Sequence, residues 1–222
     1  MRKISTSLSA VLLVLGILGP VQADLIDFES GFRDQIPVTK VITPTNVVTF
    51  GVDIDHKPAY IAKVGGLTTA FVPNDTPVDI NVSGNYFLTD EKNGPWFKLP
   101  YYMSFARPVH NLSLNLYDYR VDGGPWFGDS ATLMVFDQAG NLVGTDIYTI
   151  GWPNPMNGKI TLLSVMNPIA PITTARLEFS KRGDVGTGID NISFTTVPLP
   201  SSLLLLGSGL LGLAGWRRLK KG

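Results

Sequence analysis

The sequence predicts an all-β protein: an antiparallel jelly-roll β-sandwich lying between two terminal targeting segments. Three observations support this prediction. Short stretches alternate apolar and polar residues with a period of two, which is typical of half-buried strands. Glycine and proline recur between these stretches and mark turns. No stretch of the body keeps the spacing of an amphipathic helix over several turns.

Residues 1–23 form a predicted secretory signal peptide. Arg2 and Lys3 precede an apolar run, and Val21 and Ala23 stand at the two positions before the cut where small residues are needed. The run is about half as long as the roughly 20 residues that cross a bilayer, which argues against a permanent anchor. We therefore expect cleavage between Ala23 and Asp24, so that Asp24 begins the mature chain.

Residues 24–196 form the predicted sandwich domain. Alternation is clearest at residues 111–119, 174–180 and 188–197. The other predicted strands are residues 24–29, 47–52, 59–64, 101–109, 131–137, 142–150 and 159–165. Residues 137–144 form a predicted hairpin loop in which Gly140 and Asn141 take positive φ. Many short strands with regular turns indicate two sheets packed face to face. An immunoglobulin-like sandwich is the alternative, weakened by the lack of the cysteine pair of that fold.

Residues 197–222 form the third predicted segment. Val197 to Trp216 carries no charge and is about 20 residues long, enough for a helix to cross a hydrocarbon core of roughly 30 Å. The basic residues that follow are Arg217, Arg218, Lys220 and Lys221. Such a basic end stays in the cytoplasm. Both termini therefore predict an exported body with a tail held in the membrane.

The tail resembles the PEP-CTERM sorting signal of Gram-negative bacteria. The resemblance lies in Val197-Pro198-Leu199-Pro200, the Leu- and Gly-rich stretch and the basic end, although the usual motif has Glu where this chain has Leu199. It implies recognition by an exosortase, a membrane-embedded enzyme that cuts near the motif and passes the protein outward from the inner membrane. Proteins of this kind usually accompany exopolysaccharide. The resemblance therefore implies a structural or adhesive role at the cell surface or in the extracellular matrix, as in a biofilm.

The body resembles the galactose-binding-like jelly rolls common among exosortase-sorted proteins. The resemblance lies in residues 25–31, 105–119, 135–145 and 188–200. Jelly-roll carbohydrate-binding modules often hold a structural calcium ion between the first and last strands. The resemblance carries this role onto Asp27 or Glu29 and onto Asp190.

Asp190 also stands out without the resemblance. It has the same parity as Ile192 and Phe194, so we expect it on the core side of its strand. A buried carboxylate needs a hydrogen-bond donor or a cation, because burying it alone costs several kcal/mol. Calcium binds oxygen ligands of this type. The alternative is that backbone N–H groups of the preceding turn donate to Asp190. Calcium is therefore the one cofactor we consider, and none is certain.

Composition excludes several classes of function. Formal net charge is zero, and because the basic ends supply much of the positive charge, the body is mildly acidic and lacks a basic field for nucleic acid. The absence of cysteine excludes thiol catalysis and thiolate zinc sites, and two histidines are too few for a multi-histidine metal site. A glycosidase needs two carboxyls across one cleft, and nothing in the sequence fixes such a pair. We expect a protein that is not an enzyme, with a secreted glycoside hydrolase as the remote alternative.

Three tryptophans are the candidate glycan contacts. Trp96, Trp126 and Trp152 lie in turn-rich segments and not in alternating strands. Aromatic faces on loops can stack on sugar rings. If these three rings form an exposed platform, the chain is a carbohydrate-binding module. The alternative is that they fill the ends of the sandwich.

Overall fold

The computed structural model describes residues 23–63, 84–89, 99–117, 130–149, 160–180 and 188–197. These residues form strands and no helix, and every pairing between strands is antiparallel. The all-β prediction is confirmed. Within these ranges no helix is long and apolar enough to span a bilayer, and the predicted transmembrane helix lies outside them. The strands are β1 (Ala23–Ile26), β2 (Pro37–Val38), β3 (Lys40–Ile42), β4 (Val47–Val52), β5 (Ala59–Lys63), β6 (Tyr86–Thr89), β7 (Tyr101–Tyr117), β8 (Ser130–Phe136), β9 (Leu142–Thr149), β10 (Ile160–Val165), β11 (Ile172–Phe179) and β12 (Gly188–Thr196).

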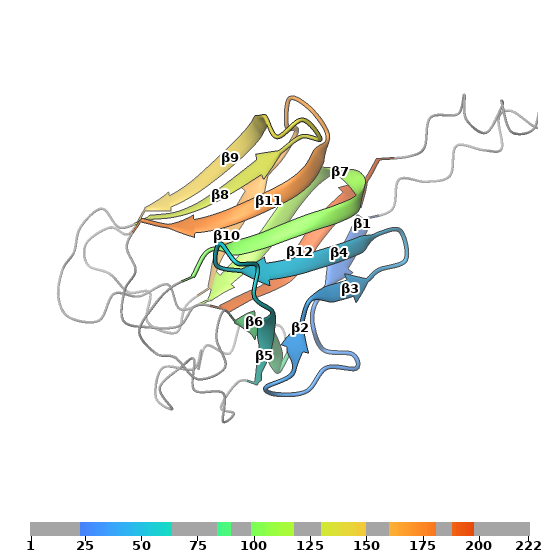
Figure 1. Cartoon of the computed structure of the whole chain (residues 1–222), viewed down its shortest axis with the longest axis vertical. Coiled ribbons are helices and arrows are strands. Elements are labelled where there is room, and N and C mark those ends of the chain that lie inside the picture. Colours follow the sequence, from blue (N-terminus) through green and yellow to red (C-terminus); the bar gives the residue numbers. More distant parts are fainter. Residues whose placement is uncertain are drawn as a thin grey trace, which may run out of the picture. The chain divides into compact units, whose positions relative to one another are not determined.

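The strands form two layers that share β7 (Figure 1). The first half of β7 pairs with β4 on one side and β11 on the other, which gives the sheet order β3-β4-β7-β11-β8-β9. The second half pairs with β12 and β10, which gives the order β2-β5-β6-β12-β7-β10. β1 pairs with the end of β12 and lies beside β6 on the same edge. We call these the first and second sheets. The jelly-roll connectivity remains a prediction.

A bend lets β7 serve both sheets. Tyr101, Met103 and Phe105 are buried in the first half, whereas Leu112, Leu114 and Leu116 are buried in the second, so the inward-facing parity switches between them. Strands that pass from one sheet to another do so at bends of this kind. The sequence predicted two strands here, and the structure has one.

Asn46 holds the bend from the neighbouring turn. Its side-chain amide donates to the carbonyl of Arg107 at 2.8 Å, and its Oδ1 accepts from the Arg107 N–H at 3.0 Å. Pro108, the residue after Arg107, has no backbone N–H and therefore cannot donate to the strand ladder. The buried Asn46 side chain thus takes the place of a backbone partner where β7 leaves the regular ladder.

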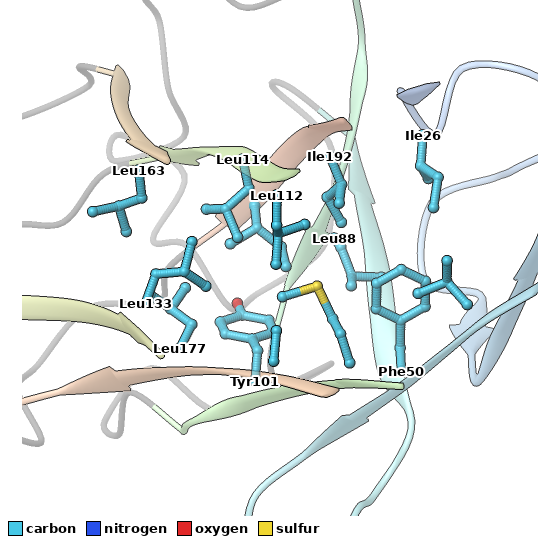
Figure 2. Packing of buried hydrophobic residues seen from close by; sticks show 14 of the residues in the cluster. Ile26, Phe50, Leu88, Tyr101, Leu112, Leu114, Leu133, Leu163, Leu177 and Ile192 are labelled. Atoms are coloured by element: carbon cyan, nitrogen blue, oxygen red, sulfur yellow. The ribbon is translucent and has the colours of Figure 1, made fainter. Parts of the chain in front are cut away.

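The core fills the space between the two sheets (Figure 2). Phe50, Tyr101 and Leu177 come from the first sheet and face Leu112, Leu114 and Ile192 from the second. All six are 3% exposed or less. Burying a side chain of this size contributes roughly 1.5–3 kcal/mol, which is how a chain without disulfides holds its fold.

The edges of the two sheets meet at β9 and β10. The Ser164 N–H donates to Oδ2 of Asp146 at 2.7 Å, and the Ile169 N–H donates to the carbonyl of Val143 at 3.2 Å. The hairpin between β8 and β9 is where the sequence placed it. Gly140 has φ of +82°, as predicted. Asn141 does not share it, and instead donates through its backbone and side chain to Asp137.

Candidate functional site

Asp190 is fully buried, as expected, but a bulge in β12 sets its direction. Asp190 pairs with Asn115 and Ser193 with Ser113, so two residues of β12 oppose a single residue of β7. Asn191 within this bulge has φ of +48°. Ile189 and Ile192 both lie in the main core, which a regular strand could not achieve. The bulge therefore directs Asp190 toward Tyr117, not to the side of Ile192 and Phe194.

Two donors reach the Asp190 carboxylate. The Tyr117 hydroxyl donates to Oδ2 at 3.0 Å, and the Asn191 N–H also bonds the carboxylate. Tyr117 packs edge-on against Phe87 in a small apolar cluster separate from the main core. Oδ1 of Asp190 is buried and has no hydrogen-bond partner among the residues that the structure describes. The alternative considered from sequence, donation by N–H groups of the preceding turn, involves residues 186–188, of which 186 and 187 lie outside the described ranges.

Asp27 and Glu29 add negative charge around Asp190. Burial, together with the nearby carboxylates of Glu29 and Asp27, raises the pKa of Asp190 to about 8 despite the two hydrogen-bond donors. Oε1 of Glu29 accepts from the N–H groups of Asn85 at 2.7 Å and Tyr86 at 2.8 Å. A side chain at Gly84, where φ is +96°, would overlap this carboxylate. The three acids named from sequence thus lie in one electrostatic neighbourhood.

The fit of this neighbourhood to a calcium ion is partial. Asp190 offers a buried, unpartnered oxygen, which is what a cation would satisfy. Among the residues that the structure describes, no three acidic or histidine side chains come close enough to hold a metal on their own. A calcium ion at Asp190 would therefore also need backbone or water oxygens, both of which calcium accepts.

A second buried acid, Asp24, lies where β1 meets the β3–β4 turn. Its Oδ2 accepts from the hydroxyls of Thr43 at 2.6 Å and Thr45 at 2.5 Å, and from the Thr45 N–H at 3.3 Å. The Thr45 hydroxyl also bonds the hydroxyl of Thr196 at 2.6 Å. Asn46 donates to the same Thr196 oxygen at 3.4 Å. We call Asp24, Thr43, Thr45, Asn46 and Thr196 the clasp.

The clasp joins the two ends of the body. Asp24 is the predicted first residue of the mature chain, and Thr196 is the last residue of β12. Ala23 pairs with Thr195 across the β1–β12 ladder, so both ends emerge side by side. Ala23 is exposed, whereas Asp24 is 3% exposed. The sequence pointed to Asp24 only as a cleavage position, because its partners are far away in the chain.

The outer face of the first sheet presents a row of side chains in register. The row runs through Gly51, Tyr102, Arg176, Met134 and Thr145, on five adjacent strands. The Arg176 guanidinium lies 5.1 Å from the centre of the Tyr102 ring and forms an ion pair with Glu178. The His56 ring packs edge-on against Tyr102 at 4.5 Å. This aromatic and charged surface was not predicted, because alternation shows which residues face outward but not which strands are neighbours.

An open cleft of about 430 Å³ lies between β1 with its following loop and β3. Its walls are mainly apolar, with Leu25, Phe32 and Ile42 among them. Asp27 is the acidic side chain in this cleft, and Lys40 is the basic one. A single carboxyl does not make the pair that glycoside hydrolysis requires.

Several predicted site residues lie outside the described ranges. They are Trp96, Trp126, Trp152, Val21, Pro198, Leu199, Pro200, Arg217, Arg218, Lys220 and Lys221. Val197 is described and is half-buried immediately after β12. The glycan-contact and cleavage predictions at these positions therefore stay predictions.

Residues 196–219 match the model of the PEP-CTERM protein-sorting motif. The match begins at Thr196, the last residue of β12. The motif indicates an exported protein with a C-terminal membrane anchor before processing, and it implies processing by an exosortase. A search of curated protein sequences gives no match.

Solved structures resemble the chain at low sequence identity. A DUF4465 family protein from Bacteroides caccae is 14% identical, with 79% of this chain and 100% of that chain covered and a TM-score of 0.47. The K2 cleaved adhesin domain of Lys-gingipain is 13% identical, with 79% and 98% covered and a TM-score of 0.45. TmCBM61 in complex with β-1,4-galactotriose is 14% identical, with 68% and 88% covered and a TM-score of 0.37. All three scores are below 0.5, so nothing is carried from these proteins to this chain.

Proposed function

We propose that this chain is a non-catalytic surface protein that contacts exopolysaccharide after sorting by exosortase in a Gram-negative bacterium. The observation that carries the proposal is the sorting motif at residues 196–219, directly joined to a folded β-body. The tail would cross the inner membrane as a helix until processing, and the body would then reach the cell surface or matrix. The body would be a jelly roll, which the pairing of the first strand with the last supports.

The outer face of the first sheet supports glycan contact. Tyr102 offers an aromatic surface beside Arg176 and His56, and Thr145 is exposed in the same row. Sugars are bound by aromatic stacking together with a few polar groups. This surface is a second candidate beside Trp96, Trp126 and Trp152.

Binding to exopolysaccharide purified from the native host tests this function. Tyr102→Ala should weaken binding about tenfold, since a lost aromatic contact costs roughly 1–2 kcal/mol. Leu162→Ala is the matched control, because Leu162 is 63% exposed and lies on the second sheet. If only the Trp96, Trp126 and Trp152 alanine variants weaken binding, the contact lies in the loops. If the unaltered protein does not bind, the glycan proposal is wrong.

We also propose a structural calcium ion held by Asp190 with Asp27 or Glu29. The buried Oδ1 of Asp190 without a hydrogen-bond partner supports this proposal. A bound cation would stabilise the folded state by mass action, by about 4 kcal/mol at a thousandfold excess over Kd. Calcium should raise the Tm relative to a chelator, and Asp190→Asn should abolish the rise. Asp137→Asn, at an exposed turn, should keep it. An equal Tm with and without calcium would contradict the proposal.

A further inference from the structure

Asp24 has an unmet hydrogen-bonding requirement that its surroundings do not explain. Three donors converge on its Oδ2, from Thr43 and Thr45. Its Oδ1 is also buried, yet no donor from the described residues reaches it. A buried carboxylate oxygen without a donor is strongly unfavourable, because burial removes the water that would otherwise bond it. Asp24 therefore lacks one partner among the described residues of the uncut chain.

Cleavage of the signal peptide creates a donor at this position. A signal peptidase hydrolyses the peptide bond between Ala23 and Asp24 with one water molecule, which leaves a carboxylate on Ala23 and converts the Asp24 backbone amide into an ammonium group. The new group is positive, has three N–H donors, and is only a few covalent bonds from Oδ1. Hydrogen bonds between oppositely charged groups are about twice as strong as neutral ones. The backbone amide that precedes cleavage is uncharged and has a single N–H, so it lacks both the charge and the additional donors of the ammonium.

We propose that the N-terminal ammonium released by signal-peptide cleavage completes the clasp by pairing with the Asp24 carboxylate. The inference rests on the predicted cleavage site and not on the glycan or calcium proposals. The body would then be more stable after export than before it. A less stable precursor suits export, because a chain that unfolds readily passes through a translocation channel more easily than a stably folded one. The same pairing would fasten β1 to β12 at Thr196, where the sorting motif begins.

The test moves the N-terminal ammonium away from Asp24 without changing the sequence of the body. The full chain is produced with its own signal peptide, exported in a bacterial host and purified in detergent with its tail retained. One form is unaltered, and the other carries Gly-Ser-Gly inserted between Ala23 and Asp24. Intact mass fixes the first residue of each form. The unaltered form should begin at Asp24, and a different first residue would overturn the proposal.

The interaction between the N-terminal ammonium and the Asp24 carboxylate is measured by urea unfolding. Both forms are unfolded in the native and in the Asp24→Asn background. The insertion should lower the ratio of folded to unfolded protein about tenfold when Asp24 is present, as expected for a charge-assisted hydrogen bond. In the Asp24→Asn background it should have little effect. An equal effect in both backgrounds, or none in either, would overturn the pairing.

A pH comparison keeps the test decisive if Asp24→Asn does not fold. An α-ammonium has an unperturbed pKa of roughly 8, and a carboxylate partner raises it in the folded state. Its stabilisation is present below this range and is lost as pH rises through the raised value. The unaltered form should therefore approach the stability of the insertion form between about pH 7 and pH 10. The other charged group that the described contacts place beside the clasp is Arg107, which donates to the Thr45 carbonyl at 3.3 Å. A pH-independent difference would contradict the proposal.

Discussion

Asp24 and Asp190 are both buried aspartates beside the same pair of terminal strands, yet their surroundings differ. Asp24 receives two hydroxyls and a backbone N–H on one oxygen. Asp190 receives one phenol and one N–H, and burial together with two further carboxylates raises its pKa. The comparison shows that burial alone does not define the role of an acid. Three donors on one oxygen make Asp24 a structural link, whereas fewer donors and the nearby negative charge make Asp190 a candidate cation ligand.

The largest expected difference between the two acids concerns pH. The Asp190 pKa rises from 3.8 to about 8 in the folded protein. Between these values the folded state keeps a proton that the unfolded state releases. The free energy of unfolding should therefore fall as pH rises, by up to about 1.4 kcal/mol per pH unit. Urea unfolding in a chelator at pH 5 and pH 7 should show a loss of about 3 kcal/mol that Asp190→Asn removes.

The control for this measurement is Asp137→Asn. This variant should show the same decrease in the free energy of unfolding between pH 5 and pH 7 as the native protein. Hydrogen bonds from Asn141 hold the pKa of Asp137 below its usual value, so its titration lies at lower pH. Identical slopes for the native and Asp190→Asn proteins would show that Asp190 does not carry a proton in this range.

The second prediction compares the same Asp→Asn substitution at the two acids. Asp24→Asn should lower the free energy of unfolding by about 2 kcal/mol at pH 7, because a neutral amide is a weaker acceptor for the clasp hydroxyls. Asp190→Asn in a chelator at the same pH should have no destabilising effect, because it removes a poorly satisfied carboxyl. Chemical unfolding of both variants checks the pair. Equal destabilisation by the two variants would remove the distinction between the sites.

The smallest effect is expected from removing one donor. Tyr117→Phe deletes the hydroxyl that donates to Asp190 and keeps the ring that packs on Phe87. We expect a loss of about 1 kcal/mol at pH 7. The pKa of Asp190 should rise further, which isotope-edited infrared spectroscopy of its carboxyl band can follow. An unchanged or lowered pKa would mean that the phenol is not an effective donor.

Local sequence pattern predicted most strands of the body but not how they combine. The alternation at residues 111–119 and 188–197 identified the later part of β7 and β12. It could not reveal that β7 continues through Pro108, because the Asn46 side chain that supports the bend comes from a distant turn. The short strands β2, β3 and β6 were missed since two to four residues carry too little periodicity.

The candidate sites show the same limit. Asp190 was identified as a buried acid, but the assumed parity ignored the bulge at Asn191. The clasp and the Tyr102–Arg176 surface were not predicted, because each joins residues that are brought together only by strand order. Contacts over such separations have no local signal in one sequence.

The intact mass of the protein isolated from its native host tests the central claim most directly. An exported body sorted through its tail should lack residues 1–23, begin at Asp24, and end near the motif that follows Thr196. A full-length mass, or a chain that keeps its first 23 residues in the cytoplasm, would contradict both the sorting route and the completed clasp.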